Sequence, residues 1–158
     1  MNKNIPTTVI DNWLEPQLAN FLSDYLYKAI LYQTGHGSNH EDNSSFLYGA
    51  VPLSPLTDFL TYKLNFIYPV EVLRIYTNLH YNNMGGSFHV DDGDITFIYM
   101  PSKKLNINEG HFEIKDEKKI EYKFNRLIYF NASKLHKGNP PKQNIPRITL
   151  AFKTKRLI

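Results

Sequence analysis

The chain has 158 residues, the size of one compact domain, and 14% of them are aromatic, nearly all Tyr and Phe. Tyr and Phe favour strands, so we expect an all-β or mostly β fold. The sequence contains no cysteine, which excludes disulfides, a thiolate nucleophile and Cys-ligated zinc. Any metal must therefore be bound by His and Asp or Glu. A net charge of +3 without long runs of like charge does not indicate nucleic-acid binding.

No targeting or membrane segment is visible. The N-terminal residues lack the apolar run of a signal peptide, and no segment is long and apolar enough to span a bilayer. We therefore expect a cytoplasmic protein that does not enter a membrane. The sequence does not indicate its oligomeric state.

Two helices are predicted in the N-terminal part. After a short strand over 7–10, apolar residues recur at three- and four-residue spacing over 14–30, with Pro16 in the position typical of a first helical turn. The same spacing over 55–66 predicts a second helix. Both are expected to pack on the outside of a sheet, as a helical support over about 1–68.

A polar loop over 35–45 and a strand near 46–50 separate these helices. The loop carries His36, His40 and Glu41, which could bind a metal. A loop of small polar residues is more simply interpreted as a solvated connection or a lid.

From Pro69 the periodicity becomes strand-like, and turn signals interrupt it repeatedly. The expected strands are 70–76, 87–90, 95–100, 111–115, 120–122, 126–131, 136–137 and 147–154. About eight short strands at this spacing predict a double-sheet, cupin-like jelly roll with two helices outside it. We expect one domain over 1–158, with its β core over about 69–155.

His89 and Asp91 are the strongest candidates for metal ligands. Residues two apart on a strand project from the same face, so both side chains can reach one ion. Two histidines and one carboxylate on one face of a metal, with other positions open, are typical of non-haem Fe(II) oxygenases. The third ligand must come from a distant strand, and His136 is the best candidate. Either histidine alone would more often be a surface or hydrogen-bonded residue.

Arg147 and Thr149 share a face of a strand that leaves an apolar segment. A buried arginine is costly unless it meets an anion, and its planar fork fits a carboxylate. Thr149 can add a hydroxyl donor. In contrast, His80, His111 and Arg126 are interpreted as structural residues.

These segments together resemble the Fe(II)/2-oxoglutarate-dependent dioxygenases, and among them the prolyl-4-hydroxylase-like branch. The similar pieces occur in family order: His89-Val90-Asp91, the strand 95–100, Glu109-Gly110-His111, the strand 124–130, His136 and Arg147-Ile148-Thr149. They cover about residues 70–154, the region that forms the family's double-stranded β-helix.

The resemblance implies that His89, Asp91 and His136 bind Fe(II) and that no further catalytic residue is needed. It also implies that 2-oxoglutarate chelates the iron and places its distant carboxylate on Arg147. O2 would be the other co-substrate, and the products would be succinate, CO2 and a hydroxylated C–H bond.

The co-substrate is also expected to meet a tyrosine. Tyr76 matches the family's tyrosine that faces 2-oxoglutarate, and Tyr81 competes with it because the first strand is longer than usual. Where many relatives have a tyrosine near the distant carboxylate, this chain has Met100.

The resemblance leaves the substrate open. The best guess is peptidyl proline or another peptide side chain. A small molecule, a nucleobase, or a noncatalytic binding or structural role on the same fold are the alternatives. Substrate choice is expected to depend on the segments 33–48, 79–86 and 103–108, which flank the predicted mouth.

Overall fold

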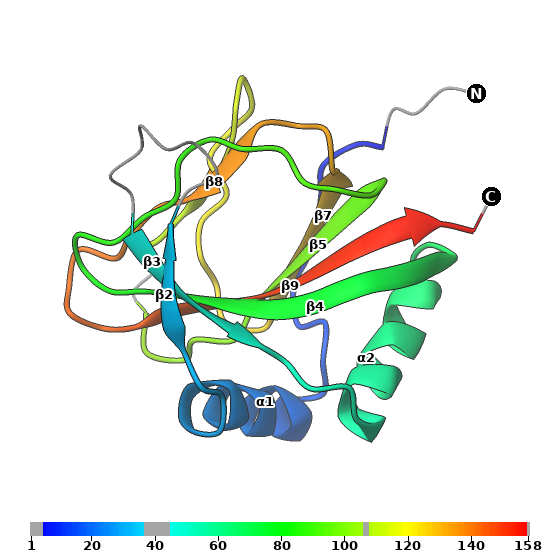
Figure 1. Ribbon diagram of the computed structural model, residues 1–158, viewed down its shortest axis with the longest axis horizontal. Helices are drawn as coiled ribbons and strands as arrows, with labels where there is room; N and C mark the ends of the chain where they lie inside the picture. The colour runs from blue at the N-terminus through cyan, green and yellow to red at the C-terminus, as the bar shows by residue number, and fades with distance from the viewer. Residues whose placement is uncertain (1–4, 37–44, 106–107, 158) are drawn as a thin grey trace.

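The computed structural model describes residues 5–36, 45–105 and 108–157. The strands of its large sheet are β1 (Thr8–Ile10), β2 (Gln33–His36), β3 (Ser45–Ala50), β4 (Val70–His80), β5 (Ile95–Met100), β7 (Arg126–Asn131) and β9 (Arg147–Arg156). Their spatial order is β1-β7-β5-β9-β4-β3-β2, and every neighbouring pair is antiparallel. The longest strands, β4 and β9, therefore lie side by side at the centre (Figure 1).

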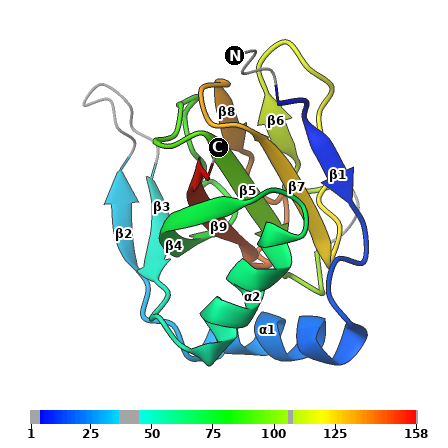
Figure 2. The same ribbon diagram turned by 90° about the vertical axis from the view of Figure 1, so that its right-hand side faces the viewer.

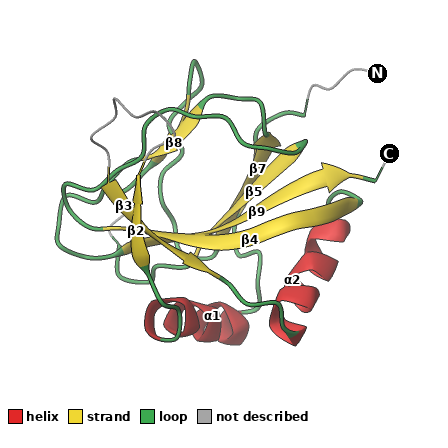
Figure 3. Cartoon of the chain, viewed as in Figure 1, coloured by secondary structure: helices red, strands yellow, loops and turns green. Residues whose placement is uncertain are grey.

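A second, smaller sheet pairs β6 (Phe112–Ile114) with β8 (His136–Gly138). The helices α1 (Pro16–Lys28) and α2 (Pro55–Asn65) lie on the other side of the large sheet (Figure 2; Figure 3). The order of layers is thus helices, large sheet, small sheet. This mostly β, jelly-roll architecture confirms the predicted fold class. Within the described residues, neither helix is long and apolar enough to cross a membrane.

Successive side chains of β9 point alternately to the two faces of the large sheet, and the two faces have different surroundings. Ile148, Leu150 and Phe152 join the apolar core under the helices. On the opposite side, Ala151 joins the smaller apolar cluster against the second sheet. Its neighbours on that side, at every second position, are Arg147, Thr149 and Lys153, and all three are buried. Polar side chains in the interior need partners, so the space between the two sheets is where a site is to be sought.

Strand β4 repeats this division. Ile75 and Leu79 belong to the core under the helices, whereas Tyr76, Asn78 and His80 face the space between the sheets. The register places Tyr76 opposite Ala151, Asn78 opposite Thr149 and His80 opposite Arg147. Two adjacent strands thus form a polar floor between the sheets.

The predicted helices and most predicted strands match the structure, and the differences have local causes. Residues 35 and 36, predicted as the start of the polar loop, belong to β2 because Gly35 allows close packing: a Cβ there would lie 2.8 Å from the ring of Phe46. Segments 87–90 and 120–122 are not strands, since each contributes only an isolated bridge. Their bridge partners, His136 and Phe112, belong to β8 and β6, three-residue strands that pair with each other. The side chains of His36, His40 and Glu41 lie outside the described residues.

Candidate metal centre

His89, Asp91 and His136 converge between the two sheets. His89 forms a single antiparallel bridge with His136 at the start of β8, through backbone hydrogen bonds of 3.0 and 2.9 Å. The backbone N–H of Asp91 donates to the carbonyl of Ala132 at 2.9 Å. These contacts bring one potential ligand atom from each of the three residues within 4.8 Å of one another.

The backbone fixes which histidine nitrogens face the centre. The Nδ1 atoms of His89 and His136 lie 2.9 and 2.8 Å from the carbonyl oxygens of Ser87 and Lys134. A carbonyl only accepts, so each Nδ1 carries the proton and each Nε2 keeps its lone pair. The Nε2 atom of His136 lies 3.1 Å from Asp91 Oδ2, and that of His89 lies 3.7 Å from Oδ1. The free lone pairs therefore point toward the carboxylate, as ligands of one ion would.

The centre favours an ionised Asp91 carboxylate beside a neutral His89 imidazole. Burial acts to raise the pKa of Asp91, but the close approach of His136 and the positive charge of Lys153 outweigh it and lower that pKa. Burial, followed by the influence of His136, lowers the pKa of His89. Metal binding needs these protonation states, because a proton on either ligand type blocks the lone pair. Two imidazoles and one carboxylate fit Fe(II) with positions left open.

Arg147 forms the other end of the site. Its side chain is buried, its Nε donates to the Gly110 carbonyl at 2.5 Å, and its guanidinium carbon lies 5.4 Å from the centre of the Tyr122 ring. The Nη2 atom is buried and has no hydrogen-bond partner among the residues that the structure describes. Burial lowers the pKa of Arg147 to about 10, so it keeps its charge at neutral pH. A buried charged fork with an unused donor is suited to bind a carboxylate.

Two β4 residues join Arg147 at this end. His80 Nδ1 and Asn78 Oδ1 are also buried, and neither has a hydrogen-bond partner within the described part of the chain. Burial, followed by the charge of Arg147, lowers the pKa of His80 to about 3, so its imidazole is neutral. A neutral imidazole adds no second positive charge beside the guanidinium and can still donate a hydrogen bond. His80, interpreted from the sequence as structural, thus lies in the lining of the cavity.

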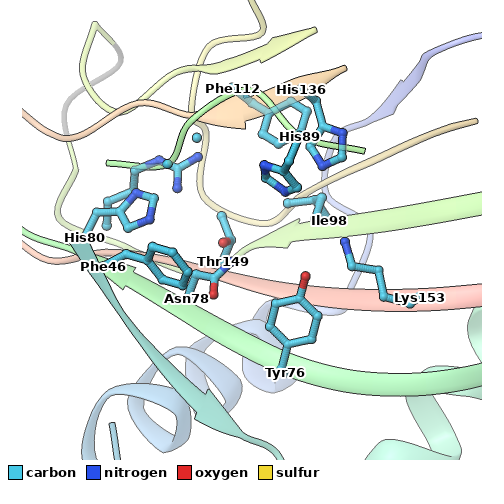
Figure 4. Close-up of a pocket in the computed structure, with 13 residues that line it drawn as sticks. Phe46, Tyr76, Asn78, His80, His89, Ile98, Phe112, His136, Thr149 and Lys153 are labelled. Carbon is cyan, nitrogen blue, oxygen red and sulfur yellow. The ribbon is translucent and has the colours of Figure 1, made fainter. Parts of the chain in front are cut away.

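One cavity of about 110 Å³ joins the two ends. His89, His136 and Lys153 lie at one end, His80 and Phe46 at the other, and Tyr76 and Thr149 along the floor (Figure 4). A small dicarboxylate fits this arrangement of an open metal face, a polar floor and a buried cation.

The predicted site residues are nearly all in this cavity. Tyr76 and Thr149 line it, as do Arg147 and the two histidine ligands, whereas Tyr81 packs against the core under the helices. Met100 is buried in the apolar cluster, and Tyr122 is the tyrosine nearest the guanidinium among the ring contacts in the described residues.

Three cavity residues, Asn78, His80 and Lys153, were not predicted as site residues. The sequence signal that could have found them is strand alternation. Asn78 and His80 follow Tyr76 at two-residue steps along β4, and Lys153 follows Arg147 at two-residue steps along β9, so each shares a face with a predicted site residue. Arg126 is structural, as predicted, with bonds of 2.6 and 3.1 Å to Asp11. Asp92 pairs with Arg74, and Asp94 accepts a hydrogen bond from the backbone of Arg156.

The sequence matches no protein-family model and no curated protein. The fold, however, is similar to solved 2-oxoglutarate-Fe(II) oxygenases. A prolyl-4-hydroxylase from Pseudomonas putida aligns with a TM-score of 0.69 and 11% identity, over 95% of this chain and 92% of that one. A Trichoplax adhaerens prolyl hydroxylase, solved with a hypoxia inducible factor peptide, gives 0.66 and 14%, over 93% and 83%.

HygX from Streptomyces hygroscopicus, solved with nickel, 2-oxoglutarate and hygromycin B, is also similar. Its TM-score is 0.67 at 10% identity, over 96% of this chain and 83% of that one. At these identities the likeness concerns the fold.

Proposed function

We propose that the protein is an Fe(II)- and 2-oxoglutarate-dependent dioxygenase that hydroxylates a C–H bond. The observation that carries this proposal is the pairing, within one cavity, of a His-Asp-His cluster with a buried arginine that has an unused donor. The likeness in fold to 2-oxoglutarate-Fe(II) oxygenases supports it.

In this proposal the chain mainly binds, orients and excludes water. His89, Asp91 and His136 hold Fe(II), while Arg147 takes the distant carboxylate of 2-oxoglutarate. His80 adds a neutral donor beside Arg147, and Thr149 and Tyr76 line the path between. Bound Fe(II) would supply the redox chemistry by which O2 and 2-oxoglutarate become succinate and CO2 while one oxygen atom enters the substrate. No protein nucleophile or general base is required.

The two ends of the cavity can be tested separately. Arg147→Ala should weaken 2-oxoglutarate binding at least about a hundredfold, because a buried charge-assisted bond contributes several kcal/mol. The affinity for Co²⁺, a redox-stable stand-in for Fe(II), should change little. Arg126→Ala is the matched control, since Arg126 is bound to Asp11 outside the cavity. Equilibrium binding of 2-oxoglutarate to the Co²⁺-loaded proteins gives the comparison. Loss of Co²⁺ affinity in Arg147→Ala would show that Arg147 is misassigned.

We further propose that the substrate is a peptide side chain, with proline as the first candidate. The likeness to prolyl hydroxylases supports a peptide, whereas the likeness to HygX supports a small molecule as the second candidate. Release of succinate in the presence of proline-containing peptides, free proline, an aminoglycoside, nucleosides and oligonucleotides would separate them. Stimulation by none of these, in protein that binds Fe(II) and 2-oxoglutarate, would favour a noncatalytic role.

A further inference from the structure

Lys153 is a fully buried lysine beside the candidate metal ligands. It lies on β9, six positions beyond Arg147 and on the same side of the strand, with 1% of its side chain exposed. Its ammonium contacts Oδ2 of Asp91. Burying an ammonium is costly unless it is paired, and among the described residues Asp91 is the one carboxylate in contact with it. Neither the three ligands nor the proposed 2-oxoglutarate site requires this lysine.

The oxygen that Lys153 contacts is the one that faces His136, whereas His89 faces the other carboxylate oxygen, Oδ1. Asp91 Oδ2 lies 3.1 Å from His136 Nε2 and accepts a hydrogen bond of 2.6 Å from Thr96 Oγ1. A divalent cation bound by His136 and this oxygen would share the oxygen with an ammonium. Two cations close together in a buried site repel each other strongly.

The position of the ammonium is constrained by its other neighbours. It lies 5.3 Å from the centre of the Tyr76 ring, and Arg74 lies 5.5 Å from the centre of the same ring. Arg74 is itself paired with Asp92 at the surface. Lys153 is therefore held between an aromatic face and Asp91.

We propose that Lys153 is a positioning residue that competes with the divalent metal for Asp91. It holds the carboxylate in place, and it lowers the affinity of the site for the metal. The inference rests on the proposed function only in that it takes His89, Asp91 and His136 as the metal ligands. Metal affinity and protein stability, rather than turnover, are the quantities it predicts.

The test measures binding of Co²⁺ alone to the full chain by isothermal titration calorimetry at neutral pH. Lys153→Met removes the charge and keeps an unbranched side chain, while Lys153→Gln also keeps a hydrogen-bond donor and guards against a folding defect in the first variant. Both should bind Co²⁺ at least about tenfold more tightly than the wild type, a difference of about 1.4 kcal/mol. Lys155→Met, on the same strand but exposed, is the matched control and should not change the affinity.

Thermal unfolding gives an independent second measurement. In EDTA both Lys153 variants should melt below the wild type, because Asp91 loses its charged partner. Saturating Co²⁺ should raise their Tm more than it raises that of the wild type. Equal or weaker Co²⁺ binding in the variants, with His136→Ala abolishing binding in the wild type, would overturn the competition and leave the metal site intact. Absence of Co²⁺ binding in the wild type would overturn the metal site and this inference together.

Discussion

The Arg147 side chain packs closely against Gly110 and Gly138, and it fits there only because these two residues have no side chain. A Cβ at Gly110 would lie 2.7 Å from Arg147 Cδ, and one at Gly138 would lie 2.8 Å from Nη1. Gly110 also has a positive φ of 64°, which other residues rarely adopt. The two glycines therefore set the direction in which the arginine points into the cavity.

This packing predicts the effect of one added methyl group. Gly138→Ala should displace the guanidinium and weaken 2-oxoglutarate binding about tenfold, a typical loss when one charge-assisted hydrogen bond is distorted. Co²⁺ affinity should stay within about twofold, since Arg147 is not a metal ligand. Gly85→Ala is the control, because the nearest atom to its Cβ would be a ring carbon of Pro140 at 3.3 Å. Equal 2-oxoglutarate affinity in both variants, measured on Co²⁺-loaded protein, would argue against the packing described.

His80 should make stability depend on pH. Burial lowers its pKa from 6.5 to about 3, so the unfolded chain binds a proton below pH 6.5 that the folded chain does not. Its contribution to stability is complete above pH 6.5 and is lost as the pH falls toward 3. The free energy of unfolding of His80→Asn should therefore vary less steeply with pH, by up to about 1.4 kcal/mol per pH unit. Urea unfolding in EDTA between pH 4 and pH 7 measures this, and identical slopes would mean that His80 is not buried as a neutral group.

At this scale the sequence predicted the residues whose chemistry is unusual, such as His89 with Asp91. It could not predict that His80 meets Arg147, because that contact depends on the register of β4 with β9. It could not predict the role of Lys153 either. A lysine near the end of a strand is usually exposed, and this one is buried with its ammonium against Asp91 and the Tyr76 ring.

Among the elements, the turn before β7 attaches the start of α1 to the large sheet through Asn125. This buried residue has a φ of 63°. Its Nδ2 donates to the Leu14 carbonyl at 2.7 Å, and its Oδ1 accepts from Leu14 N at 3.0 Å and from the Tyr99 hydroxyl at 3.1 Å. The backbone carbonyl of Asn125 accepts a further bond from Trp13 N at 3.1 Å. One side chain thus satisfies both backbone groups of Leu14, just before the helix.

Two substitutions at Asn125 distinguish how much its side-chain hydrogen bonds and its backbone conformation each contribute to stability. Asn125→Gly should cost about 2–3 kcal/mol, since it removes three buried hydrogen bonds but tolerates a positive φ. Asn125→Ala should lower the free energy of unfolding by about 1 kcal/mol more, because it loses the same hydrogen bonds and alanine also disfavours a positive φ. Both should leave Co²⁺ affinity unchanged. Urea unfolding gives the order, and a more stable Ala variant would show that the positive φ is unimportant.

The elements themselves were predictable to different degrees. The two helices and β5, β7 and β9 have long, regular patterns, and the sequence located them well. The segments 87–90 and 120–122 are short and follow turns, and whether they form ladders depends on the length of their partners. Strand β2 contains Gly35, and the need for a glycine there becomes apparent only when Phe46 of β3 is seen to lie against it.

In the whole molecule, the large sheet has a different role on each face. The face under α1 and α2 holds most of the apolar core, and the opposite face carries the polar floor below β6 and β8. The layering, with two helices outside a jelly roll, followed from composition and periodicity. The volume and lining of the cavity did not, because they are set by how closely a sheet of two short strands lies over β4 and β9.

The central claim is that this cavity binds Fe(II) and 2-oxoglutarate together. Under anaerobic conditions, Fe(II) and 2-oxoglutarate should produce a visible metal-to-ligand charge-transfer band in the wild type. Zn(II) in place of Fe(II) should give none. His136→Ala should abolish the band because a metal ligand is lost, and Arg147→Ala should require a much higher 2-oxoglutarate concentration to produce it. A wild type without the band, or a His136→Ala variant that keeps it, would contradict the account.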